Sequence, residues 1–261
     1  MDVNVFISTY REAFGEAAEL PIVFWFSDEP VADTEKTGGC FFKGMAAVRQ
    51  GTPISLSEET VACMGGKLYT GFSGMSERIP DFVSLKEKYK QTPEMVREFV
   101  DSLGMPRNTQ DYLNFARIDK VERFDKVEGV LFFATPDMLS GLATWAYFDN
   151  NSNDTVTAMF GSGCSAIVTN AVVENGRNGR RTFLGLFDPS VRPFVEANVL
   201  SFVIPMSRFK EMYHTMRSCC LFGTHAWQKV RDRINGVSEP HTKIPSPEIE
   251  THIRPKELAS I

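Results

Sequence analysis

Hydrophobic positions along this chain change repeatedly from the spacing of a helix to the spacing of a strand. In residues 3–19 the apolar side chains recur every three or four positions, which predicts a helix that Pro21 ends. Residues 22–26 are continuously apolar, aromatic and β-branched, a pattern typical of a buried strand. The spacing then predicts a helix over residues 40–50 and a strand over residues 53–57.

The same alternation continues as far as residue 235. Thr92 and Pro93 form a helix start, as N-cap and first-turn residue, and the apolar stripe that follows ends at Gly104. Further strands are predicted at residues 121–124, 129–134, 155–160, 182–187 and 199–204, and further helices at residues 136–148, 205–220 and 224–235. This alternation predicts the α/β (or α+β) class, with a mixed sheet flanked by helices.

One order of elements occurs twice: strand, helix, strand, a turn rich in Gly and Cys, and helix. The two occurrences cover about residues 20–75 and 128–175. They predict either an internal duplication or a chance recurrence of a common pattern. We expect a single α/β domain at residues 1–236. Residues 237–261 hold four prolines and few large apolar residues, which predicts an extended C-terminal arm that lies over the surface or joins copies into a homo-oligomer.

Composition and charge narrow the classes of function. Of the 261 residues, 43% are hydrophobic and 23% charged, as in soluble globular proteins. A net charge of −5 argues against a nucleic-acid partner, and no apolar run is long enough to predict a membrane span. The N-terminus lacks the basic start and apolar core of a signal peptide. Five cysteines at irregular spacing then favour a cytoplasmic protein with free or ligating thiols over a disulfide framework.

The sequence predicts the same kind of position for three cysteines: each lies at or just before a helix N-terminus, next to glycine. There the unpaired N–H groups and the positive end of the helix dipole favour a thiolate, and glycine lets a ligand approach the backbone. The candidate catalytic or metal-ligating residues are Cys40, Cys63 and Cys164. The candidate cofactor-binding residues are Gly65, Gly66, Gly161, Gly163, Lys43 and Lys67.

These residues leave three functions open. The cysteines could hold an iron–sulfur cluster or another soft metal, or could supply a reactive thiol for redox or transfer chemistry. Alternatively, the glycine turns bind a small anionic molecule through backbone N–H groups and the cysteines only pack. A third alternative is an interaction protein that docks through its C-terminal arm. No Cys-x-x-Cys occurs, so neither a zinc knuckle nor a thioredoxin-like motif is predicted.

Two other groups have simpler interpretations. His225 is the best histidine for a Cys–His dyad, although a solvated or core histidine is the simpler alternative. Cys219 and Cys220 follow a helix rich in Met and Phe, which predicts that they pack in the core.

At the cysteine turns the chain resembles an uncharacterised family, the ArCR group or domain-of-unknown-function family 169. The resemblance rests on Pro21-Ile22-Val23-Phe24, Cys40-x₅-Ala46, Gly51, Cys63-x-Gly65-Gly66-x₄-Gly71-Phe72, Gly163-Cys164 and Val203-Ile204-Pro205 with Phe209. It covers roughly residues 20–216. It implies a shared site at Cys40, Cys63 and Cys164, because the family typically places cysteines at these positions, but it implies no activity. The Pro-rich tail and the Cys219-Cys220 pair depart from the family pattern.

Overall fold

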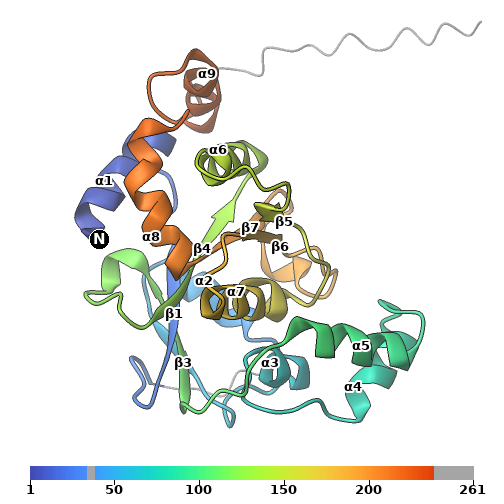
Figure 1. The fold of residues 1–261 in the computed structure, drawn as a ribbon. Helices are drawn as coiled ribbons and strands as arrows, with labels where there is room; N and C mark the ends of the chain where they lie inside the picture. The colour runs from blue at the N-terminus through green and yellow to red at the C-terminus, as the bar shows by residue number, and fades with distance from the viewer. Residues whose placement is uncertain (34–38, 238–261) are drawn as a thin grey trace, which may run out of the picture.

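A mixed seven-stranded sheet runs through the part of the chain that the computed structural model describes, residues 1–33 and 39–237 (Figure 1). Its strand order is β2-β3-β1-β4-β7-β6-β5. Neighbouring strands are antiparallel except for the parallel pair β5 and β6. The strands are β1 (Ile22–Ser27), β2 (Ile54–Leu56), β3 (Tyr112–Arg117), β4 (Val127–Ala134), β5 (Val156–Thr157), β6 (Thr182–Gly185) and β7 (Leu200–Pro205). The predicted α/β class with a mixed sheet is confirmed.

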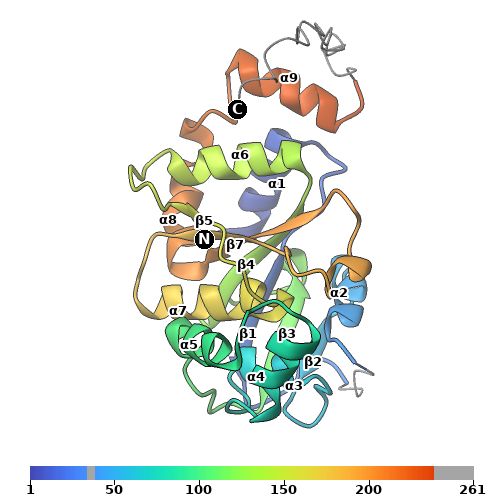
Figure 2. The ribbon, with the colours of Figure 1, turned by 90° about the vertical axis from the view of Figure 1, so that its right-hand side faces the viewer.

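Helices cover both faces of this sheet, so the fold has three layers (Figure 2). One face carries α1 (Val3–Phe14), α6 (Pro136–Tyr147), α8 (Met206–Thr215) and α9 (His225–Ile234). The other carries α2 (Phe42–Arg49), α3 (Met64–Tyr69), α5 (Pro93–Leu103) and α7 (Asn170–Gly176). Shorter helical segments are α4 (Arg78–Asp81), η1 (Phe82–Lys86), η2 (Ile118–Lys120), η3 (Ser165–Thr169), η4 (Arg192–Phe194) and η5 (Met216–Ser218). We call the first face the α6 face and the second the α7 face.

Alternation along β1 shows why its sequence is continuously apolar. Phe24 packs in the core of the α7 face, whereas its neighbour Val23 packs in the core of the α6 face. Successive side chains of a strand point to opposite faces, so a strand covered by helices on both sides needs apolar residues at every position. The strand predicted at residues 22–26 is thus confirmed.

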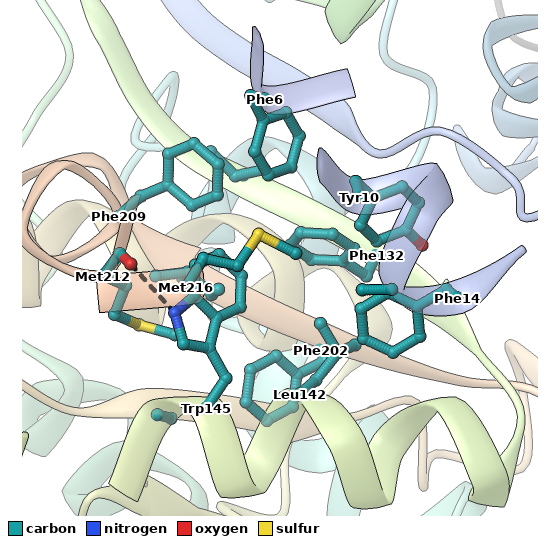
Figure 3. Packing of buried hydrophobic residues seen from close by; sticks show 14 of the residues in the cluster. Phe6, Tyr10, Phe14, Phe132, Leu142, Trp145, Phe202, Phe209, Met212 and Met216 are labelled. Atoms are coloured by element: carbon teal, nitrogen blue, oxygen red, sulfur yellow. Dashed lines mark hydrogen bonds between the residues drawn. The ribbon is translucent and has the colours of Figure 1, made fainter. Parts of the chain in front are cut away.

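The α6 face holds a buried core rich in aromatic residues (Figure 3). Trp145 is fully buried, and its Nε1–H donates to the carbonyl oxygen of Met212 at 2.8 Å, which satisfies the one polar group of its ring. Phe209 packs edge-to-face on Phe6 and on Trp145, with ring centroids 5.0 and 6.1 Å apart. These contacts join α1, α6 and α8 over the sheet.

Several predicted elements differ from the observed ones. The sequence patterns did not predict β3, because Asn114 interrupts its apolar pattern. That side chain is buried: it accepts from Ser55 Oγ and donates to Ser27 Oγ, each at 2.7 Å. Residues 121–124 are not a strand, and the predicted strand at 155–160 is reduced to Val156–Thr157. The helix predicted to reach residue 220 ends as α8 at Thr215 and continues as η5.

The internal duplication is not confirmed. The strands β1 and β4 are antiparallel neighbours, and only a two-fold axis perpendicular to the sheet can relate such strands. That axis would place the helices that follow them, α2 and α6, on the same face, but they lie on opposite faces. This mismatch gives the duplication no support, and it stays a prediction. So does the arm at residues 237–261, because residues 238–261 lie outside the described residues.

No helix in the described ranges is long and apolar enough to cross a membrane.

Candidate functional site

The structure brings Cys40, Cys63 and Cys164 to the α7 face of the sheet. Cys40 lies just before α2, Cys63 is the N-cap of α3, and Cys164 directly precedes η3. The Thr169 hydroxyl fixes the second and third segments to each other by donating to the Tyr69 carbonyl oxygen at 2.6 Å. Three helix starts that are distant in sequence thus lie on the same face of the sheet.

Cys40 and Cys164 are in direct contact. Their side chains form a hydrogen bond, and this bond is the main reason that the pKa of Cys40 is lowered to about 7. Partial burial raises the Cys40 pKa, whereas the Phe42 N–H and the charge of Lys43 lower it. The pKa of Cys164 is raised well above its ordinary value by the same hydrogen bond and by complete burial. The pair therefore shares one proton, held by Cys164, beside a thiolate at Cys40.

Cys63 lies near this pair but has a different partner. Its Sγ accepts a hydrogen bond from the Gly66 N–H at 3.4 Å and so caps α3. A Cβ at Gly65 would lie 3.8 Å from both the Cys63 Sγ and the Tyr69 ring, so the glycine leaves that side of the thiol uncovered.

The other candidate glycines allow close packing. A Cβ at Gly66 would lie 2.8 Å from the Val61 side chain, and one at Gly163 would lie 2.8 Å from the Phe42 ring. Gly163 is thus what lets the Cys164 helix approach α2. A Cβ at Gly161 would lie 2.5 Å from the Ser165 hydroxyl. These three positions have a structural reason to be glycine, whether or not a cofactor binds there.

Of the two candidate lysines, only Lys43 belongs to the Cys40 environment. Its positive charge helps to lower the Cys40 pKa. Lys67 lies in the last turn of α3, away from the end that carries Cys63.

Sequence reasoning missed three polar residues of this site: Asp188, Tyr69 and Tyr89. The Asp188 carboxylate is 4% exposed and accepts from the N–H and the hydroxyl of Ser190, both at 2.9 Å. It also forms a side-chain hydrogen bond with Tyr89 and acts electrostatically on both Cys40 and Cys164. Tyr69 ends α3, Tyr89 lies in the loop after η1, and Asp188 lies in the loop after β6. No local motif joins those segments.

Both tyrosines are held in the protonated form. Burial raises the pKa of Tyr69 to about 12, and electrostatic interactions with Cys164, Asp188 and Cys63 add to this effect. Desolvation and Asp188 raise the pKa of Tyr89 to about 12 as well. Two phenols that keep their protons near neutral pH therefore belong to this site, Tyr69 through Cys164 and Asp188 and Tyr89 through Asp188, and each is able to donate a hydrogen bond.

The metal prediction gains no support from this geometry. Within residues 1–33 and 39–237, no group of three or more His, Cys, Asp or Glu side chains is arranged to hold a metal ion. Cys40 and Cys164 pair with each other, and Cys63 bonds to Gly66. A cluster would need all three thiols to turn toward one point.

A Cys–His dyad through His225 is wrong. His225 begins α9 on the α6 face, so the sheet separates it from the cysteine site.

Cys219 and Cys220 lie on that same face, and their predicted packing is confirmed. Cys219 is in the core, where its Sγ donates to the Met216 carbonyl oxygen at 3.0 Å and burial raises its pKa to about 11. Cys220 is partly buried against the same core.

Comparison with known proteins identifies the family. The model of the DUF169 family, described as uncharacterised ArCR, matches residues 19–215, which include all three site cysteines, both site tyrosines and Asp188. No curated protein and no solved structure matches the chain. Because the match covers more than half of the chain, the chain belongs to the DUF169 family of uncharacterised ArCR proteins.

Proposed function

We propose that this protein carries out thiol chemistry in which the Cys40 thiolate attacks an electrophilic substrate. The observation that carries the proposal is the hydrogen bond between Cys164 and Cys40. A thiol in contact with a second, buried thiol acquires a donor that favours its charged form. With a pKa of about 7, Cys40 is thiolate in about half of the molecules at neutral pH, which is close to the optimum for an attacking thiol.

The surrounding groups suit this role. Lys43 and the Phe42 N–H stabilise the thiolate, and the Lys43 charge also favours an anionic substrate. Tyr69 and Tyr89 keep their protons and can donate to negative charge that develops on a leaving group. Asp188 orients Tyr89 by hydrogen bonding. Nucleophile, charge stabiliser and proton donors thus gather on one face of the sheet.

The alternative of an anion-binding module has weaker support. Its backbone donors already have partners: the Gly66 N–H bonds to Cys63, the Ser165 N–H to the Ser162 hydroxyl, and the Phe42 N–H to Cys40. An anion would have to displace these caps. The iron–sulfur alternative would require the thiols to rearrange. A cytoplasmic location remains part of the proposal, because a reducing compartment keeps such thiols available.

Alkylation of each cysteine as a function of pH tests the proposal. We expect iodoacetamide to modify Cys40 first, with a midpoint near pH 7. Cys219 should stay unmodified under the same conditions, because it is buried and its pKa is about 11. Peptide mass spectrometry of the full chain measures both rates.

The variants Cys164→Ala and Cys63→Ser locate the cause of this reactivity. Loss of the Cys164 donor should move the Cys40 midpoint toward the ordinary cysteine value of about 8.5, whereas Cys63→Ser should leave it near its wild-type position. A wild-type midpoint of 8.5 or above, or one that Cys164→Ala leaves in place, would contradict the proposal.

A further inference from the structure

We infer that Cys40 and Cys164 form a reversible disulfide, and that the electrophile this site takes is itself a disulfide, which the cysteine pair reduces. The inference rests on the proposed function, since it requires Cys40 to be the attacking thiol. Its geometric basis is the direct contact of two thiols that α2 and the helix after Gly163 bring together. Among the described residues, no group of three or more His, Cys, Asp or Glu side chains that includes these thiols is arranged to hold a metal ion.

The two thiols differ in solvent exposure, and this difference gives them different roles in the reaction. Cys40 is partly exposed, whereas Cys164 is 5% exposed and lies in the core of the α7 face. A substrate can reach Cys40 from solvent but cannot reach Cys164. The Cys164 thiol can react only with a disulfide that has already formed at Cys40. This arrangement fits an attacking thiol and a resolving thiol.

The reaction balances without another reactant. The Cys40 thiolate attacks one sulfur of a substrate R–S–S–R, a Cys40–S–S–R bond forms, and RS⁻ leaves and takes a proton from solvent. Cys164 then gives its proton to solvent and attacks the Cys40 sulfur, so that the Cys40–Cys164 bond forms and the second RS⁻ leaves and is protonated. Two electrons pass from the pair to the substrate, which is released as two thiols. A dithiol reductant reverses the change in the protein.

The electrostatics of the pair favour this order of events. The hydrogen bond to Cys40, with burial and the Cys40 charge, holds the proton on Cys164 in the resting pair. A mixed disulfide at Cys40 removes the negative charge, so the pKa of Cys164 falls and its thiolate forms when it is needed. The resolving thiol thus becomes active only after the attacking thiol has reacted.

Cys63 provides the matched control. It is the third thiol of the site, but its Sγ bonds to the Gly66 N–H, and it touches the pair only through its charge. If any neighbouring cysteine could resolve the mixed disulfide, Cys63→Ser would change the products. If resolution of the mixed disulfide requires the contact between Cys40 and Cys164, Cys63→Ser should behave as wild type.

The test uses oxidised glutathione as the disulfide, with the full chain and with Cys164→Ser and Cys63→Ser. We expect wild type and Cys63→Ser to release two glutathione thiols per chain and to yield a peptide cross-linked through Cys40 and Cys164. Cys164→Ser should release one thiol and retain glutathione on Cys40. Dithiothreitol should restore the free thiols in every case. Non-reducing peptide mapping and thiol titration provide the readouts.

The outcomes separate this inference from the proposed function. If wild type stops at a stable Cys40–glutathione adduct, Cys40 is a reactive thiol but the resolving role of Cys164 is wrong. A bond from Cys40 to Cys63 would overturn the inference in the same way. If Cys40 neither takes up glutathione nor reacts with iodoacetamide, both proposals fail. The wild-type measurement decides these cases even if a variant does not fold.

Discussion

Both faces of the sheet carry cysteines, two on the α6 face and three on the α7 face, and Cys219 and Cys40 show how their surroundings differ. On the α6 face, Cys219 follows η5 and donates its S–H to the Met216 carbonyl oxygen. On the α7 face, Cys40 precedes α2 and accepts hydrogen bonds from Cys164 and from the Phe42 N–H. The pKa of Cys219 is about 11 and that of Cys40 is about 7. The surroundings thus raise the pKa of one cysteine and lower that of the other.

The difference shows that burial alone does not make a reactive thiol. Removal from water disfavours the thiolate, which is what raises the pKa of Cys219. Cys40 is also partly buried, but donors outweigh this effect. The hydrogen-bond donors are decisive: the Cys164 thiol lowers the Cys40 pKa most, and the Phe42 N–H at the start of α2 lowers it further.

If, as proposed, the chemistry belongs to the α7 face, the α6 face serves stability, and Trp145→Ala should show the largest effect. This substitution removes the largest fully buried side chain of the α6 face and its hydrogen bond to Met212. We expect the free energy of unfolding to fall by about 3–5 kcal/mol. Urea denaturation measures the loss, and in the folded fraction the Cys40 alkylation midpoint should stay near pH 7.

Tyr147→Ala, two residues further along α6, is the matched control. Tyr147 is 40% exposed and its hydroxyl donates to the Asn153 carbonyl oxygen at the surface. Its removal should cost no more than about 0.5 kcal/mol. If Trp145→Ala costs as little as Tyr147→Ala, or displaces the Cys40 midpoint, the division between the two faces is wrong.

Sequence reasoning could locate the cysteines but not their surroundings. A cysteine beside glycine at a change from loop to helix is a local signal, and it placed Cys40 and Cys63 before α2 and α3 and Cys164 at the start of the third helix. Asp188 and Tyr89 could not be found in this way, because they enter the site only through tertiary packing of separate loops. The choice between metal and thiol chemistry likewise depends on side-chain directions, which no spacing encodes.

The same limit applies to the fold. The apolar run of β1 was predictable because burial on both faces imposes it. Strand β3 was missed because Asn114 interrupts its apolar pattern. Two hydrogen bonds to serines of other segments allow this asparagine to be buried, and such partners cannot be predicted from the local sequence. Periodicity therefore predicts the elements whose burial is purely apolar.

Gly163→Ala should have the next largest effect, because it disturbs the contact between α2 and the Cys164 helix. Its Cβ would lie 2.8 Å from the Phe42 ring and 2.9 Å from the Val191 side chain, closer than packed atoms allow. We expect a loss of about 1–3 kcal/mol in stability. Because the helices must separate, the Cys40 midpoint should also rise above pH 7, as alkylation measures.

Gly176→Ala is the control for this substitution. Gly176 is the last residue of α7, and a Cβ there would have no neighbour within 4 Å. Alanine should therefore be neutral or should stabilise the helix by up to about 1 kcal/mol. Equal effects of the two substitutions would show that Gly163 does not set the distance between Cys40 and Cys164.

The smallest expected effect is the dependence of stability on pH, and the two faces should differ in its sign. The Cys40 pKa is lower in the folded protein than in the unfolded chain, where it is about 8.5. Between about pH 7 and 8.5 the unfolded chain therefore binds more protons at this residue, and stability rises with pH. We expect Cys40 to contribute about 1 kcal/mol across this interval, a value already reduced because its side chain is partly exposed to solvent.

Cys219 should act in the opposite direction, because its folded pKa is raised to about 11. Its contribution is complete below the unfolded pKa and is lost as the pH rises toward 11. Urea denaturation in the presence of a reductant, with wild type, Cys40→Ser and Cys219→Ser at several pH values, isolates each term as a difference from wild type. The Cys40 difference should grow between pH 7 and 8.5, and the Cys219 difference should shrink only above that interval. Two differences with the same sign of slope would mean that the hydrogen bond from Cys164 does not keep Cys40 charged, and the contrast between the two faces would disappear.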